Sequence, residues 1–136
     1  MSETPAGTTP VDGIVNTRSP LPVTGTVERL SQLISAVGAT MFGVIDQSDE
    51  AEQTGLTLRP TTLLIFGNPA AGTPVMAAAP LAALDLPLKI LVWQDDDGAV
   101  WMTYLDPAWL AARYGLAKEL TAALGAPAAL TARVAD

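Results

Sequence analysis

The sequence predicts an α+β fold, in which a mostly antiparallel five-stranded sheet packs against helices on one face. Two observations favour this class. An amphipathic pattern spans residues 26–37, and apolar runs flank the Asp-Gly pair at 97–98, which is typical of a β-hairpin. Hairpin-linked strands beside grouped helices favour an antiparallel two-layer arrangement. The expected element order is β-α-β-β-short α-β-β-α.

The first strand is predicted over residues 14–17, and Pro20 and Pro22 follow it. The first helix is expected to start near Thr24 or Thr26, because either hydroxyl could cap the exposed amides. Its apolar face recurs at helical spacing and is expected to be buried on the sheet; it consists of Val27, Leu30, Ile34 and Val37. Gly38 suits the left-handed position after the helix.

Two further strands are predicted over residues 40–46 and 61–66. Apolar residues fall on both faces of each, so both are expected to be covered on two sides for at least part of their length. The Thr73-Pro74 pair predicts a helix start, with threonine as N-cap and proline in the first turn. Pro80 should end that helix near residue 79.

The hairpin joins residues 88–94 to residues 99–105. A two-residue turn would place Trp93 opposite Met102. A three-residue turn with a glycine bulge would place it opposite Trp101, and the sequence does not decide between the two registers.

A last helix begins at Asp106-Pro107 and resumes over residues 118–124. The chain is therefore divided into a flexible leader (1–12), one α+β domain (13–124) and an alanine-rich tail (125–136).

Composition excludes several classes of function. The net charge is −7 and there is no basic run, which disfavours nucleic-acid binding and anionic membrane surfaces. The chain has neither cysteine nor histidine, so thiolate and imidazole metal sites are excluded, and no metal or cofactor is expected. The leader has no signal-peptide pattern and no apolar stretch could span a bilayer, so a soluble cytoplasmic protein is expected.

Five separated motifs occur in an order that resembles the domain of unknown function 302 family. They are Phe42 to Asp46, Pro60 to Pro69, Gly72 to Pro74, Leu84 to Leu88, and Tyr104 to Gly115. The resemblance implies a TATA-binding-protein-like β-α-β4-α fold and a homodimer, but no known reaction. Relatives often carry histidine after the aspartate that matches Asp46, whereas this chain has Gln47, which can hydrogen-bond but cannot titrate.

Polar residues at strand ends beside apolar strands suggest a ligand site between sheet and helix. The candidate ligand-binding residues are Asp46, Gln47, Thr62, Phe66, Gly67, Asn68, Trp101 and Tyr104. The Phe66-Gly67-Asn68-Pro69 segment is the most interesting, because its loop runs into a helix start, where free backbone amides suit an anion. The same Gly-Asn-Pro sequence is also typical of an ordinary turn with no ligand role.

Other clusters have simpler explanations. Carboxylates at 46–52 complement a helix dipole, and Asp95, Asp96 and Asp97 are expected at a solvated hairpin tip. Five aromatic residues in the last third could line a pocket, but core or dimer packing is the simpler expectation; they are Trp93, Trp101, Tyr104, Trp109 and Tyr114.

Three hypotheses follow. The first is a small cytosolic homodimer that binds a small, partly apolar ligand. The second is a histidine-free enzyme with Asp46 as acid or base and with Asn68 and backbone amides as oxyanion donors, which requires burial to raise the pKa of that carboxyl. The third is a protein-interaction or assembly module.

Overall fold

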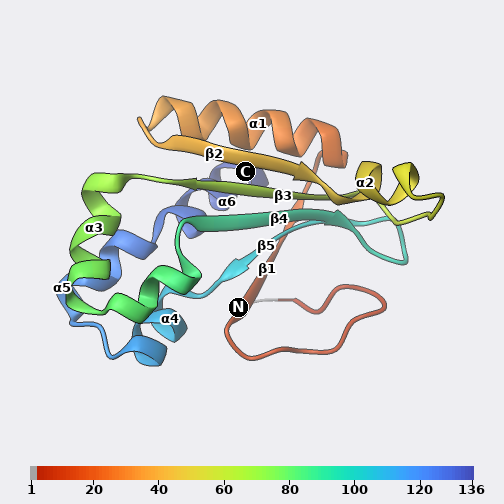
Figure 1. Ribbon diagram of the computed structural model, residues 1–136. Coiled ribbons are helices and arrows are strands. Elements are labelled where there is room, and N and C mark those ends of the chain that lie inside the picture. The colour runs from red at the N-terminus through yellow and green to blue at the C-terminus, as the bar shows by residue number, and fades with distance from the viewer. Residues whose placement is uncertain (1–2) are drawn as a thin grey trace.

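The computed structural model describes residues 3–136, and a five-stranded sheet forms its centre (Figure 1). The strands are β1 (Ile14–Ser19), β2 (Thr40–Asp46), β3 (Thr61–Gly67), β4 (Leu88–Gln94) and β5 (Val100–Leu105). They lie in the order β1-β5-β4-β3-β2, and each neighbouring pair is antiparallel. The predicted α+β class is confirmed.

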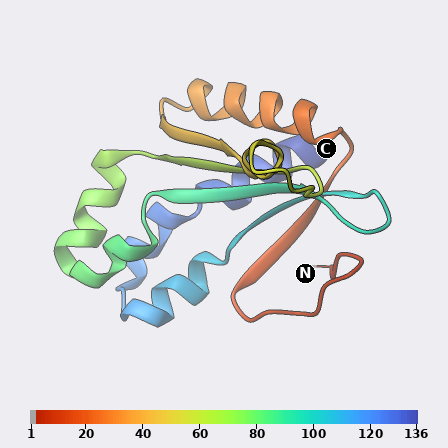
Figure 2. The ribbon, with the colours of Figure 1, turned by 45° about the vertical axis from the view of Figure 1, so that its right-hand side comes forward.

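The helices lie in three places around the sheet. They are α1 (Val23–Ala36), α2 (Gln47–Gln53), α3 (Pro69–Ala78), the 3-10 turn η1 (Pro80–Asp85), α4 (Pro107–Tyr114), α5 (Lys118–Thr121), the 3-10 turn η2 (Ala122–Leu124) and α6 (Ala126–Ala135). The long helix α1 and the C-terminal α6 contact each other on one face of the sheet. Helices α3, α4 and α5 cluster at one end of the sheet, while α2 and the hairpin tip lie at the other (Figures 1 and 2).

The core lies between the sheet and the α1–α6 layer. Alternate strand residues point into it, so Leu64, Ile90 and Met102 are fully buried against Leu30 and Ile34 of α1. Val27 is only partly buried, and Val37 is 54% exposed rather than buried as expected. Val37 is the C-cap residue, so it lies beyond the last turn that contacts the sheet.

No helix among residues 3–136 lies on the opposite face of the sheet, and the N-terminal segment covers that face beside Trp101. On β3 the buried positions alternate with half-buried ones, so the expectation that both faces are covered was wrong. Strand β2 is an edge strand with Phe42 and Val44 half exposed, which also differs from the prediction. We call this uncovered side the open face; its central residues are Ile45, Leu63, Ile65, Leu91 and Trp93.

The C-terminal residues are part of the domain and not a tail. Residues 126–135 form α6, which buries Leu130, Thr131 and Val134 against β1, β4, β5 and α1. The alanine-rich composition gave no clear signal for this helix, because only three larger residues anchor its ten residues to the rest of the domain.

The start of α1 differs from the prediction, and the register of the hairpin, which the sequence left open, is resolved. Helix α1 begins at Val23 after Pro22, and no side chain caps it. Thr26 instead bonds its hydroxyl to Ser19 and to the Pro22 carbonyl. In the hairpin, Trp93 pairs with Trp101, which is the register of the glycine-bulge turn.

Residues 3–13, before β1, form no helix or strand, but they are held in place. Pro5 is buried, and the Ala6 amide donates to the Asp95 carboxylate at 3.1 Å. Gly13 has a φ of 81° and lies against the indole of Trp109.

Gly13→Ala should therefore destabilise the fold more than a matched glycine change. An added Cβ would lie 2.3 Å from the Trp109 ring, whereas Gly38, with a φ of 76°, has open space around it. We expect Gly38→Ala to cost about 1 kcal/mol from its backbone conformation alone. Gly13→Ala should cost roughly 1–2 kcal/mol more, because the indole must move. Urea unfolding of both variants measures the difference, and equal losses would contradict this reading.

Candidate functional site

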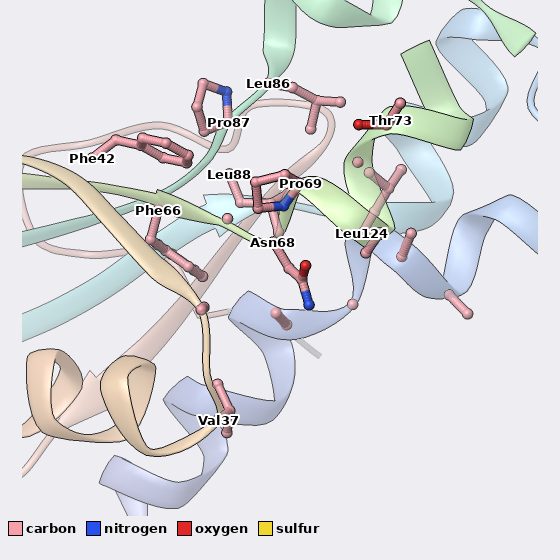
Figure 3. Close-up of a pocket in the computed structure, with 18 of the residues that line it drawn as sticks. Val37, Phe42, Phe66, Asn68, Pro69, Thr73, Leu86, Pro87, Leu88 and Leu124 are labelled. Carbon is pink, nitrogen blue, oxygen red and sulfur yellow. The ribbon is translucent and has the colours of Figure 1, made fainter. Parts of the chain in front are cut away.

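An apolar cavity opens where the end of the sheet meets the helices clustered there (Figure 3). Its volume is about 640 Å³, within the usual range for small-molecule sites. We call it the apolar cavity. Its lining includes Val37 and Phe42 near the edge strand, Phe66, Gly67 and Asn68 at the end of β3, and residues from α3, η2 and α6.

Local sequence positions Asn68 at the mouth of this cavity. Asn68 is the N-cap of α3, and its Oδ1 accepts from the Ala70 amide at 3.0 Å. The predicted helix start at Thr73 was wrong, because Asn68-Pro69 provides the same cap-then-proline signal five residues earlier and Pro74 is tolerated inside the helix.

The start of α3 does not form an anion site. Pro69 has no amide hydrogen, Ala70 donates to the Asn68 side chain, and Ala71 and Gly72 both donate to the Asn68 carbonyl. No residue that lines the apolar cavity carries a charge. An ionised group placed there would lose its hydration without compensation, so the cavity suits neutral molecules.

Two polar side chains of this lining, Asn68 and Thr73, are available to a ligand. The side-chain oxygen of Asn68 makes the helix cap. The Nδ2 of the same side chain donates to no residue within 3–136. In Figure 3 the Asn68 side chain extends between Val37 and Leu124. An acceptor on an otherwise apolar ligand would find its partner here.

The predicted site residues fall into separate places. Phe66, Gly67 and Asn68 line the apolar cavity. Asp46 and Thr62 line a second pocket of about 450 Å³ beside the start of α1, which we call the helix-start pocket. Its full lining is Pro22, Val23, Thr24, Val27, Val44, Asp46, Ser48, Pro60, Thr62 and Gln94.

The remaining candidates join neither pocket. Gln47 is exposed on the first turn of α2, and Tyr104 belongs to the core. Trp101 is buried beside the N-terminal segment, where its indole donates to Asp95 at 2.8 Å. None of the five C-terminal aromatic residues lines the apolar cavity.

The proposed Asp46–Asn68 catalytic pair is not assembled. Asp46 pairs with Thr62 at one end of the β2–β3 ladder, whereas Asn68 follows Gly67, which pairs with Thr40 at the other. Six residues of strand separate them by roughly 20 Å. Hydrogen bonds from Ser48 and from the Asp49 amide also lower the pKa of Asp46, which is the opposite of what a general acid or base needs.

The two acidic clusters differ in their roles. Asp46 caps α2, in line with the dipole explanation. Asp95 is not solvated as expected for a hairpin tip: it is 6% exposed and accepts hydrogen bonds from four donors, while Asp96 and Asp97 are exposed. Within residues 3–136 no group of three acidic side chains is arranged to hold a metal ion.

Sequence reasoning missed most of the apolar cavity. Val37 at the end of α1, Met76 in α3 and residues 122–126 of η2 and α6 also line it. Their only signal is small or flexible apolar side chains near helix ends, which is common in any domain.

The sequence matches a known family of proteins. The family model "Domain of unknown function DUF302" matches residues 15–132. The chain belongs to the DUF302 family. The fold agrees with the crystal structure of an uncharacterised conserved DUF302 protein from Bacillus stearothermophilus, with a TM-score of 0.78, 19% identity, and coverage of 91% of this chain and 99% of that one.

Curated relatives of this DUF302 chain are longer proteins. It is 42% identical over 104 residues to "Fluoride-specific ion channel FluC 1" of Brucella suis biovar 1 (strain 1330) and to the protein of the same name from Brucella abortus biovar 1 (strain 9-941). These matches cover 76% of this chain but only 41% and 38% of the two relatives. Among the helices of residues 3–136, none is long and apolar enough to cross a membrane.

Proposed function

We propose that this DUF302 domain binds a small, neutral and mostly apolar molecule in the apolar cavity. The observation that carries the proposal is a cavity of about 640 Å³ whose lining has no charged residue. Burial of apolar ligand surface against Phe66, Met76 and Leu88 would provide most of the affinity.

The ligand should carry one hydrogen-bond acceptor, such as a ketone or ether oxygen. Asn68 Nδ2 is the matching donor, and the amides at the start of α3 are already bonded. A carboxylate or phosphate is disfavoured for the same reason.

As part of this proposal the protein acts as a cytoplasmic homodimer that pairs through its open face. Ile45, Leu63 and Leu91 form one row across three adjacent strands, and no helix in the described part of the chain packs on that side. A second copy placed there would bury aliphatic surface that a thin two-layer domain leaves in water. The lack of cysteine fits a reducing compartment.

Binding can be tested with prodan, a neutral dye that carries a ketone, and with 2-nonanone as its competitor. We expect saturable dye fluorescence that 2-nonanone displaces, whereas octanoate, which is similar in length but charged, should compete at least about tenfold less well. No saturable signal, or equal competition by octanoate, would refute the proposal.

Substitutions in the lining test whether the dye binds in the apolar cavity. Ala129→Trp should block the cavity, since Ala129 lines it, while Ala132→Trp on the same helix has no place in the lining and is the control. Asn68→Asp keeps an N-cap oxygen but removes the donor and adds a charge, so it should also abolish dye binding without loss of helix. Binding that survives Ala129→Trp would place the dye elsewhere.

A second candidate function is an accessory module for a fluoride channel. The favouring observation is that the chain is 42% identical to part of proteins named as fluoride-specific ion channels. A strain that lacks this protein would then grow less well in fluoride, and the channel of the same organism would co-purify with it. Unchanged fluoride tolerance together with no co-purification would dismiss this candidate.

A further inference from the structure

The helix-start pocket lies at the opposite end of α1 from the apolar cavity, about 20 Å away along the 14-residue helix. Its floor is formed by the ends of three strands, through Val44, Thr62 and Gln94. The first turn of α1 forms one wall. Unlike the apolar cavity, this pocket mixes apolar and polar groups in a volume of about 450 Å³.

Thr62 is a mostly buried residue whose hydroxyl has no partner within residues 3–136. The residue is only 6% exposed, its side chain lies on the helix-covered face of β3, and it lines the pocket. No residue among 3–136 hydrogen-bonds to its Oγ1, whereas the other buried threonines, Thr26 and Thr131, bond to backbone carbonyls. No side-chain oxygen or nitrogen of these residues is both fully buried and without a partner, so the Thr62 hydroxyl is accessible, and from the lining of the pocket it can hydrogen-bond to a bound group.

The start of α1 also presents free donors to this pocket. Pro22 cannot cap the helix, and the amides of Val23, Thr24 and Gly25 donate to nothing in the described part of the chain. Helices α2, α3 and α4 differ, since Asp46, Asn68 and Asp106 cap them. Unbonded amides at the positive end of a helix dipole favour a carboxylate.

Asp46 provides the opposite charge at the rim. Its Oδ1 accepts from the Ser48 hydroxyl and from the Asp49 amide, while Oδ2 accepts from no residue within 3–136. Asp46 is the one charged residue in the lining of this pocket. Its free oxygen suits an ammonium group.

We propose that the helix-start pocket binds a small α-amino acid with an aliphatic side chain. The carboxylate would bond to the free amides of α1, the ammonium to Asp46 Oδ2, and the Thr62 hydroxyl would meet a polar atom of the same backbone. The aliphatic side chain would pack on Val27, Val44 and Pro60.

Charge balance selects this class of ligand. A simple amine would leave the α1 amides unbonded, and a simple carboxylate would lie close to Asp46 with no cation between them. Only a zwitterion satisfies both ends of the pocket at once.

Three molecules of nearly the same shape test the proposal: L-leucine, 3-methylbutylamine and 4-methylpentanoate. In ¹H–¹⁵N NMR titrations, leucine should shift the amides of Val23, Asp46 and Thr62 saturably. The amine and the acid should bind at least about tenfold more weakly, because each lacks one charge-assisted contact. No saturable shift with leucine up to about 20 mM, or equal binding of all three, would overturn the proposal.

The matched variants are Thr62→Val and Thr40→Val. Valine keeps the volume of Thr62 and removes its hydroxyl, so leucine binding should weaken about fivefold, which is the usual contribution of one hydrogen bond. Thr40 is exposed at the other end of β2, so its variant should bind leucine as the wild type does. Unchanged leucine binding by Thr62→Val would exclude the proposed contact.

This test is independent of the one for the apolar cavity. Ala129→Trp should abolish prodan binding and leave leucine binding intact, whereas Thr62→Val should weaken leucine binding and leave prodan binding intact. Failure of one site is therefore distinguishable from failure of the other.

Discussion

Leu91→Glu should leave the protein folded and make it monomeric. Leu91 lies on β4, the middle strand of the sheet, and points to the open face between Leu63 and Thr103. In a dimer that pairs through this face, two carboxylates would be buried near the symmetry axis without partners. That cost amounts to several kcal/mol, so the dissociation constant should rise by about 1,000-fold or more.

The control for this change is Leu84→Glu. Leu84 is 78% exposed on η1, away from the open face, so the same substitution there should not alter the oligomeric state. Sedimentation velocity at micromolar concentration distinguishes the two variants, and circular dichroism checks that each is folded. A Leu91→Glu protein that remains dimeric, or a wild type that is already monomeric, would refute the proposed dimer.

Asp95→Asn should be the most damaging single change among the acidic residues. The buried carboxylate accepts from the Ala6, Asp97 and Ala99 amides and from the Trp101 indole. An asparagine would turn an NH₂ group toward at least one of these donors. We expect the melting temperature to fall by roughly 10 °C, with release of the N-terminal segment from the hairpin.

The same carboxylate should make stability depend on pH. The Trp101 hydrogen bond, together with those from the three amides, lowers the pKa of Asp95 from 3.8 to about 2, in spite of its desolvation. The folded-state pKa is depressed, so the unfolded chain binds more protons as the pH falls. The stabilisation is complete above about pH 4 and is lost as the pH falls through about 2.

Urea unfolding at pH values from 2 to 5 tests both statements about Asp95, with Asp97→Asn as the control. Asp97 is exposed in the same hairpin, and its side chain has no hydrogen-bond partner among residues 3–136. Asp97→Asn should retain the wild-type loss of stability below pH 4, and Asp95→Asn should flatten it. Equal pH profiles would show that Asp95 does not carry this dependence.

Much of the fold could be predicted from the sequence because its signals are local. The amphipathic repeat of α1, the Asp-Gly turn and the Asp106-Pro107 helix start depend on residues that are neighbours in the chain, and each matches the structure. Local signals also failed where two competed. Asn68-Pro69 and Thr73-Pro74 both resemble helix starts, and only the first one caps α3.

The sites depend on contacts between distant segments, which only the tertiary structure decided. The antiparallel β2–β3 ladder separates Asp46 from Asn68, although both are polar residues at strand ends. The turn η2 and helix α6 bring residues 122–126 and Ala129 to the apolar cavity that Asn68 also lines, and no pattern in an alanine-rich stretch indicates that meeting. By itself the sequence determined most of the elements and the chemistry available at each position. Packing determined which groups meet, and left Thr62 Oγ1 without a partner among residues 3–136.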